Sequence, residues 1–169
     1  MNQQIVHVSF EDFLRTGVFG VIKFGMTSHQ IQTILGNPDF VFTRRKSRRP
    51  TGFEYGDIEF YFVSLRDNFL CGIYLDEFDV PKGSQLLKVD AWCLRAKMSQ
   101  TEVELALAQA GITFQPTEML DSSMDGIITE GGVVLGFVRT LEEFSPPPGL
   151  YNIFRDLRAE IELSETGHN

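Results

Sequence analysis

The side chains best suited to chemistry are carboxylates, which occur in two short segments. Glu54, Asp57 and Glu59 surround a predicted hairpin turn, and Asp76, Glu77 and Asp79 follow a predicted strand. Two carboxylates can serve as acid and base when they face one cleft in different environments. Because these six lie in turns or on the polar side of an alternating strand, we interpret them as solvated surface charges. The sequence therefore predicts no catalytic residue and a protein that is not an enzyme.

The histidines and cysteines form no recognisable metal or nucleophile motif. His7, His29 and His168 are far apart, and no Cys-x-x-Cys or His-x-x-x-His spacing occurs. Cys71 and Cys93 have apolar neighbours, which favours buried free thiols over a disulfide. Phosphate-binding and nucleophile-elbow motifs are also absent from the sequence. We expect no metal site and no cofactor.

A cluster of cations is the sharpest local charge feature. It comprises Arg44, Arg45, Lys46, Arg48 and Arg49. The cluster is either a solvated loop that offsets an acidic body or a docking loop for an acidic partner or a nucleic-acid backbone. No aromatic residues interrupt it, and the net charge of the chain is −8, so nucleic acid is the less favoured partner.

Composition indicates an ordinary globular protein with an aromatic-rich core or groove. The chain has 169 residues, of which 43% are apolar and 22% charged, and it contains 15 Phe. This length allows one domain or two small ones in contact. The N-terminus has no signal-peptide pattern, and no apolar run approaches the roughly 20 residues that span a bilayer. We expect a cytoplasmic location.

Two similar segments define the most informative pattern. Residues 26–31, Met-Thr-Ser-His-Gln-Ile, are matched by residues 98–103, Met-Ser-Gln-Thr-Glu-Val. In each, a hydroxyl residue can cap a helix and a Gln or Glu three positions later can close a capping box. The preceding methionine can pack on the Ile or Val at the fourth helical position, as in a hydrophobic staple. The sequence therefore predicts two helices with the same start.

The elements between and after these helices follow from periodicity and turn residues. A short helix is expected over 9–14, with Ser9 as its cap and a stop at Gly17. An extended segment is expected over 18–24, and two hairpins over 53–62 and 126–138. Further strands are expected over 69–75 and 86–94. The spacing of Leu150, Ile153, Phe154, Leu157 and Ile161 predicts an amphipathic C-terminal helix. The turn-rich residues 81–84 predict a boundary between unit 1–85 and unit 86–169.

The spacing of the two halves suggests a duplication. Gly36 to Ile58 is 22 residues, as is Gly111 to Val133, and both halves have the order helix, glycine stop, short strand, loop and hairpin. The run 25–38, from Gly-Met-Thr to Leu-Gly-Asn-Pro, resembles the helix of the BamE/SmpA-like lipoproteins. It is also similar to the tandem repeat unit of the β-lactamase inhibitor proteins. The resemblance implies helices packed on antiparallel sheet and a role in binding other proteins, as in small bacterial immunity-type proteins.

We therefore expect an α+β protein of two related units of helices packed on antiparallel sheet, with one continuous sheet as an option. The expected function is a non-enzymatic protein-binding module, of the immunity or inhibitor type, for a partner with a basic face. The expected binding residues are Glu59 and Tyr61, which point away from the buried side of their strand, together with four arginines of the basic cluster: Arg44, Arg45, Arg48 and Arg49. The alternatives are a small hydrolase or ligand-binding protein with an aromatic pocket, and a nucleic-acid-linked regulator that uses the basic loop.

Overall fold

The computed structural model describes residues 4–43, 50–64, 68–76, 79, 81–139 and 148–160. In these residues the chain forms the following elements: β1 (Val6–Ser9), α1 (Phe10–Thr16), α2 (Ser28–Leu35), β2 (Phe40–Thr43), β3 (Pro50–Tyr55), β4 (Ile58–Ser64), β5 (Asn68–Leu75), β6 (Leu87–Asp90), α3 (Gln100–Gln109), β7 (Phe114–Thr117), β8 (Met124–Thr129), β9 (Val134–Val138) and β10 (Gly149–Asp156).

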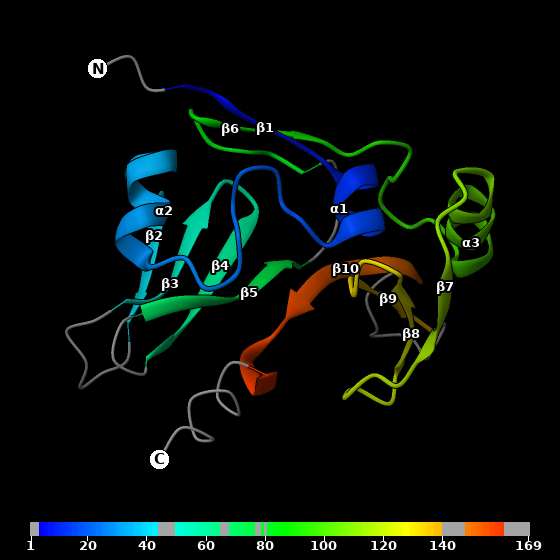
Figure 1. The fold of residues 1–169 in the computed structure, drawn as a ribbon. Helices are drawn as coiled ribbons and strands as arrows, with labels where there is room; N and C mark the ends of the chain where they lie inside the picture. Colours follow the sequence, from blue (N-terminus) through cyan, green and yellow to red (C-terminus); the bar gives the residue numbers. More distant parts are fainter. Residues whose placement is uncertain are drawn as a thin grey trace.

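One antiparallel sheet of eight strands dominates the molecule. Its order is β2-β3-β4-β5-β10-β9-β8-β7, and β1 pairs with β6 in a separate parallel ribbon of two strands. The helices and this ribbon lie along one side of the sheet (Figure 1). The prediction of an α+β protein is confirmed. The two units do not form separate helix-on-sheet bodies, however, because β10 pairs with β5 and joins all eight strands.

The two predicted capping boxes begin α2 and α3. Thr27 Oγ1 accepts a hydrogen bond from the Gln30 amide, and the Gln30 side chain accepts one from the Thr27 amide. Ser99 and Glu102 make the same reciprocal pair in α3. The glycine that follows α2 has φ +79° and the one that follows α3 has φ +69°, a region that side chains rarely enter. Local sequence therefore determines where both helices begin and end.

One hydrophobic cluster fills the space between the helices and the sheet. It contains the inward residues of strands from both halves, such as Ile58, Phe60, Ile127 and Leu135, together with buried residues of all three helices. Much of it is aromatic: Phe13 and Phe19 meet edge to face at 5.1 Å between ring centroids, and Phe19 meets Phe60 at 5.9 Å. Trp92 is partly buried and packs against this cluster.

The largest correction concerns the C-terminal segment. Up to residue 156 this segment forms the strand β10, where the sequence predicts a helix. A β-bulge lies between Leu150 and Asn152, so that Leu150 and Ile153 both face the core although they are three residues apart. This i, i+3 spacing resembles the stripe of a helix. The predicted end at residue 161 lies outside the described residues.

Two smaller corrections concern extended segments. Residues 18–24 form turns with a single bridge between Phe19 and Ile22, not a strand. The strand predicted over 86–94 is only the four residues of β6. Both segments are apolar because they cover the core, which periodicity alone cannot distinguish from strand pairing.

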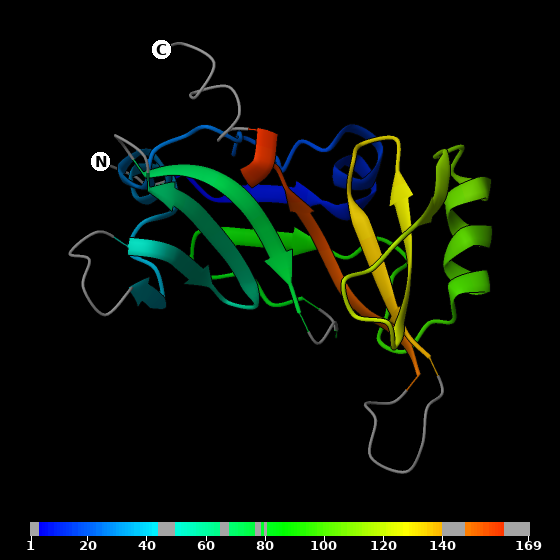
Figure 2. The same ribbon diagram turned by 90° about the horizontal axis from the view of Figure 1, so that it is seen from below.

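The two halves of the sheet have the same order of elements. In the first half α2 is followed by β2, β3, β4 and β5, and in the second α3 is followed by β7, β8, β9 and β10. The central pair is β5 and β10, and the order of strands is mirrored about it. Figure 2 shows the strands spread between α2 at one end and α3 at the other. The boundary at residues 85 and 86 and a superposition of the halves stay predictions.

Candidate functional site

The face of the sheet that points away from the core cluster, here called the open face, carries a row of side chains across all eight strands. Strand register places one residue per strand side by side, in the order Phe40, Glu54, Glu59, Tyr74, Phe154, Val134, Ile128 and Gln115. A second row lies beside it in the first half: Phe42, Gly52, Tyr61, Gly72 and Asp156. Residues directly opposite on paired strands share a face and can interact.

Five rings of these rows make a continuous series of contacts, here called the aromatic row: Phe40, Phe42, Tyr61, Tyr74 and Phe154. The centroid distances along the series are 5.2, 5.6, 5.2 and 5.2 Å. Phe42 stacks on Tyr61 at an interplanar angle of 12°, and Tyr74 stacks on Phe154 at 4°. The aromatic row therefore crosses from the edge strand β2 to β10 in the middle of the sheet.

Carboxylates fix the two tyrosines of the aromatic row. The Tyr61 hydroxyl donates a hydrogen bond to Glu59 Oε2 at 2.7 Å, and the Tyr74 hydroxyl donates one to Asp156 Oδ2. Burial, followed by these hydrogen bonds to carboxylates, raises the pKa of both tyrosines well above the usual range. Both hydroxyls therefore stay protonated at neutral pH, and both rings are held in one orientation.

Two glycines let the rings approach the sheet. A Cβ atom on Gly52 would lie 2.8 Å from Phe42 Cδ2 and 3.0 Å from the Phe60 carbonyl oxygen, and one on Gly72 would lie 2.7 Å from Tyr74 Cε2. Both distances to the rings are shorter than side-chain packing tolerates. Glycine at these positions is therefore a packing requirement of the aromatic row.

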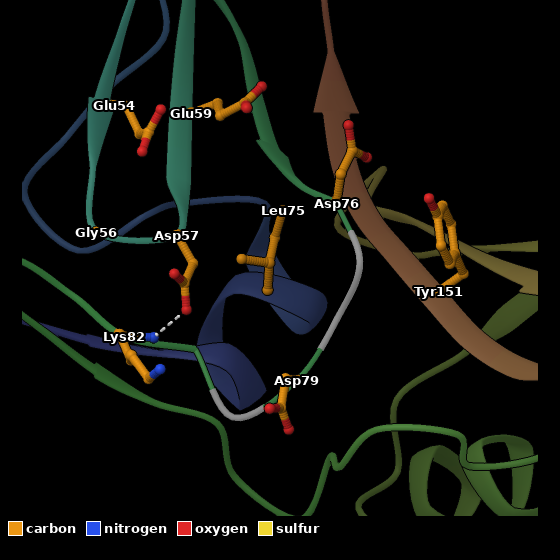
Figure 3. Close-up of a pocket in the computed structure, with 9 residues that line it drawn as sticks. All are labelled: Glu54, Gly56, Asp57, Glu59, Leu75, Asp76, Asp79, Lys82 and Tyr151. Atoms are coloured by element: carbon orange, nitrogen blue, oxygen red, sulfur yellow. Dashed lines mark hydrogen bonds between the residues drawn. The ribbon is translucent and has the colours of Figure 1, made fainter. Parts of the chain in front are cut away.

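An acidic cleft of about 530 Å³ lies beside the aromatic row, at the β3–β4 turn (Figure 3). Its lining comprises Glu54, Gly56, Asp57, Glu59, Leu75, Asp76, Asp79, Lys82 and Tyr151. Asp57 Oδ2 accepts a hydrogen bond from the Lys82 amide at 2.8 Å, which fixes the turn. In the described parts of the chain, no group of three or more His, Cys, Asp or Glu residues is placed to hold a metal ion.

The predicted site residues have different outcomes. Glu59 and Tyr61 lie on the open face, as predicted, and each is half-buried. Arg44, Arg45, Arg48 and Arg49 lie outside the described residues. That either group binds a partner stays a prediction.

Sequence reasoning missed the other parts of the site. Tyr74, Phe154 and Asp156 come from β5 and β10, which are more than 70 positions apart in the chain, and only strand register brings them together. The alternation of buried and exposed residues along each strand could have indicated these side chains, but the sequence predicts a helix in place of β10. One cleft is lined by five of the residues that were interpreted as solvated surface charges: Glu54, Asp57, Glu59, Asp76 and Asp79.

The cysteines differ from each other. Both are free, as predicted, but Cys71 is buried and Cys93 is exposed, which corrects the prediction for Cys93. Cys71 Sγ donates a hydrogen bond to the Tyr61 carbonyl at 3.4 Å, and burial raises its pKa. This thiol therefore stays protonated at neutral pH and packs beneath the site.

Comparison with protein-family models, with curated proteins and with solved structures gives no match for this chain. The resemblance to BamE/SmpA-like and inhibitor-type repeats therefore stays a prediction. None of the helices in the described ranges is long and apolar enough to cross a membrane; α3, at ten residues, is the longest.

Proposed function

We propose that this protein is a non-enzymatic, cytoplasmic protein-binding module, of the immunity or inhibitor type, whose partner has a basic face. The observation that carries the proposal is the aromatic row with its carboxylates on the open face. Interfaces are typically dominated by a few aromatic anchors, while opposite charges on the two surfaces steer the encounter. The open face of the first half supplies both kinds of group.

The fixed geometry of the tyrosines supports this proposal. Tyr61 and Tyr74 are each held by a carboxylate and by a neighbouring ring. A side chain that is already ordered loses little conformational entropy when a partner docks on it. The rings therefore form a preorganised surface, and Glu59, which accepts the hydrogen bond of Tyr61, contributes to the negative field that attracts a basic partner.

We propose further that the two halves descend from one unit of a helix followed by four strands. The repeated order of elements supports this proposal. So does the strand register: counted from the central β5–β10 pair, Gly52 of β3 and Gly126 of β8 occupy equivalent places. The resemblance to tandem inhibitor-type repeats implies helices packed on antiparallel sheet, which agrees with this proposal.

The two alternative functions receive less support. A small hydrolase or ligand-binding protein would use the 530 Å³ cleft, but six of its nine lining residues are charged. Sites for small molecules are usually lined mostly by apolar side chains. The nucleic-acid alternative depends on Arg44, Arg45, Arg48 and Arg49, which lie outside the described residues, so it stays a prediction.

The test is a kinetic study of binding to the partner, once the partner has been captured with the tagged protein and purified. Association should slow as salt rises, and Glu59→Lys should slow it further, because exposed charges act mainly on the encounter. Tyr61→Ala should instead speed dissociation. Kinetics that do not respond to salt, with unchanged affinity in both variants, would contradict a basic partner on the open face.

A further inference from the structure

Two glycines lie side by side on the open face of the second half, Gly126 of β8 and Gly136 of β9; they are here called the glycine pair. Gly126 occupies the place that Gly52 has in the first half, where the rings of Phe42 and Tyr61 cover the backbone. The strands of the second half supply no ring at this place, because Gly136 stands where the first half has Tyr61. The glycine pair therefore depends on other residues for its cover.

Methionine side chains provide that cover. Met119 lies in the connection between β7 and β8. Its sulfur would be 2.6 Å from a Cβ atom on Gly126, and its methyl carbon would be 2.8 Å from one on Gly136. The methyl carbon of Met124 would also be 2.8 Å from a Cβ atom on Gly136. Because methionine is unbranched and flexible, Met119 can leave the glycine pair by rotation of its side chain alone.

The position of Met119 leaves a polar atom unpaired. Asn152 of β10 lies opposite Gly136, and a Cβ atom on Gly136 would collide with Asn152 Oδ1, so this oxygen lies beside the two methionine methyl groups. Asn152 Oδ1 is buried and accepts no hydrogen bond from the residues that the structure describes. A buried acceptor without a donor costs free energy. This cost favours departure of Met119, because the oxygen then becomes accessible to a donor.

The backbone that carries Met119 is fixed, so that the side chain moves independently of it. Asp121 Oδ1 accepts a hydrogen bond from the Ser123 amide at 2.8 Å, and the Arg139 guanidinium donates one to the Ser122 carbonyl at 3.1 Å. Rotation of Met119 would therefore open a recess of about the width of one side chain. The glycine pair would form its floor, and the unpaired oxygen would lie in its wall.

We propose that this recess binds a small aromatic molecule that carries one N–H or O–H group, such as a phenol. The ring would replace Met119 on the glycine pair, as rings cover Gly52 in the first half, and its O–H would donate a hydrogen bond to Asn152 Oδ1. Such a ligand covers apolar surface and also pairs the buried acceptor, the combination that is usual in sites for small molecules. The narrow recess favours a free molecule over an aromatic side chain with peptide groups on either side. This site is separate from the partner surface on the first half.

The test titrates the full-length protein with phenol and follows the methyl signals of the methionines by NMR. The chain has five methionines, so each signal can be assigned by substitution. Anisole offers the same ring without the O–H group, and N-acetyltyrosinamide offers the same phenol between two peptide groups. The three titrations on the wild type therefore separate the ring, the donor and the source of the ligand.

Four variants locate the site. Met119→Ala uncovers the glycine pair, and Gly126→Ala places a methyl group on it. Leu120→Ala is the matched control, because Leu120 is the fully exposed neighbour of Met119 in the same connection. Asn152→Ala removes the unpaired oxygen, and urea denaturation of this variant measures whether that oxygen stabilises the fold.

We expect phenol to bind about fivefold more tightly than anisole, the ratio for one hydrogen bond between neutral groups, and N-acetyltyrosinamide to bind more weakly than phenol. Met119→Ala should strengthen phenol binding, because the side chain no longer competes for the recess. Gly126→Ala should weaken it and Leu120→Ala should leave it unchanged. Asn152→Ala should abolish the preference for phenol over anisole, with a urea midpoint that is unchanged or higher.

Phenol that shifts no methyl signal of Met119 in the wild type would overturn the site. Equal binding of anisole would overturn the hydrogen bond to Asn152, and equal binding of N-acetyltyrosinamide would assign the glycine pair to a side chain of a protein partner. A lower urea midpoint in Asn152→Ala would show that the oxygen is already paired in solution. That result would also contradict the proposal, because Met119 would then gain nothing by leaving.

Discussion

The open faces of the two halves have the same strand order but different side chains. Beside the central pair, β4 carries Glu59 and Tyr61, and β9 carries Val134 and Gly136 in the equivalent places. One strand further out, Glu54 of β3 corresponds to Ile128 of β8. Outside the central β5–β10 pair, the open face of the first half is therefore aromatic and acidic, whereas that of the second half is aliphatic and small. A shared scaffold with one chemically distinct half is consistent with binding concentrated in that half.

A glycine lies at the equivalent position of the open face in each half, but different side chains cover the two glycines. In the first half, Gly52 lies beneath the rings of Phe42 and Tyr61. In the second, Gly126 lies beneath Met119, whose sulfur would be 2.6 Å from a Cβ atom at that position. Methionine is unbranched and flexible and can move aside, whereas stacked rings cannot do so without losing their contacts. The first half is thus the more rigid surface.

The largest difference in stability is expected when alanine replaces these equivalent glycines. Gly52→Ala should destabilise the fold by about 1–3 kcal/mol, the usual cost of overpacking, because the new Cβ meets a ring and a carbonyl oxygen at 3.0 Å or less. Gly126→Ala should cost less than about 1 kcal/mol, because only the Met119 and Thr117 side chains must move. Urea denaturation of both variants measures the difference. Equal losses in the free energy of unfolding would show that the packing above Gly52 and above Gly126 is equally constrained.

The next largest effect on stability concerns the helix caps. Loss of the cap should destabilise both halves by a similar amount. Thr27→Ala and Ser99→Ala should each lower the free energy of unfolding by about 0.5–2 kcal/mol, because each leaves an amide at the start of a helix without its acceptor. Thr33→Ala, which removes an exposed hydroxyl from the interior of α2, is the matched control. If neither cap variant differs from this control, the capping boxes do not hold the helices.

Alkaline pH should affect the first half in particular. The pKa values of Tyr55, Tyr61 and Tyr74 are raised, mainly by burial, so folding favours their neutral forms. The resulting stability is complete below about pH 10 and is lost as the pH rises further. As the pH rises, these three tyrosines should therefore ionise, as measured by tyrosinate absorbance, only when the protein unfolds. Tyr61→Phe and Tyr74→Phe should each reduce the alkaline loss of stability, and ionisation of all tyrosines in the intact fold would be the contrary result.

The smallest expected effect is a pH dependence that only the second of the two capping boxes should show. The first box uses the neutral Gln30, and the second uses Glu102, whose pKa is lowered by hydrogen bonds from the Ser99 amide and hydroxyl. The contribution of Glu102 is present above its ordinary pKa of about 4 and is lost as the pH falls below it. Ser99→Ala should raise the pKa of Glu102, as measured by NMR titration. An unchanged value would mean that the serine does not stabilise this carboxylate.

Elements with local signals could be predicted from the sequence. The caps of α2 and α3 and the hairpin turn at Gly56 and Asp57 depend on residues within a few positions of one another. The strand β10 could not be predicted, because its bulge places Leu150 and Ile153 on one face with a helical spacing. The pairing of β10 with β5, which makes the sheet continuous, follows from that strand and was missed with it.

The site could be predicted only in part, for the same reason. Glu59 and Tyr61 were found because the alternation of β4 shows which side chains leave the core. Their neighbours Tyr74 and Phe154 belong to strands that are distant in sequence, and nothing local indicates that the two rings stack. The contrast between the two halves likewise becomes visible only when the register matches Tyr61 with Gly136.

Exchange of residues between the two halves tests the central claim most directly. One variant gives the first half the side chains of the second, Glu59→Val with Tyr61→Gly. The other is the matched control Val134→Glu alone, because a Cβ atom on Gly136 would lie 2.2 Å from Asn152 Oδ1. Affinity for the purified partner is measured for both, and denaturation confirms that each is folded. We predict that the first variant loses at least about 100-fold in affinity, as expected when a hot spot of 2 kcal/mol or more is removed together with a steering charge, and that the second binds as the wild type does. Retained affinity in the first variant, or its loss only in the second, would contradict a binding surface on the first half.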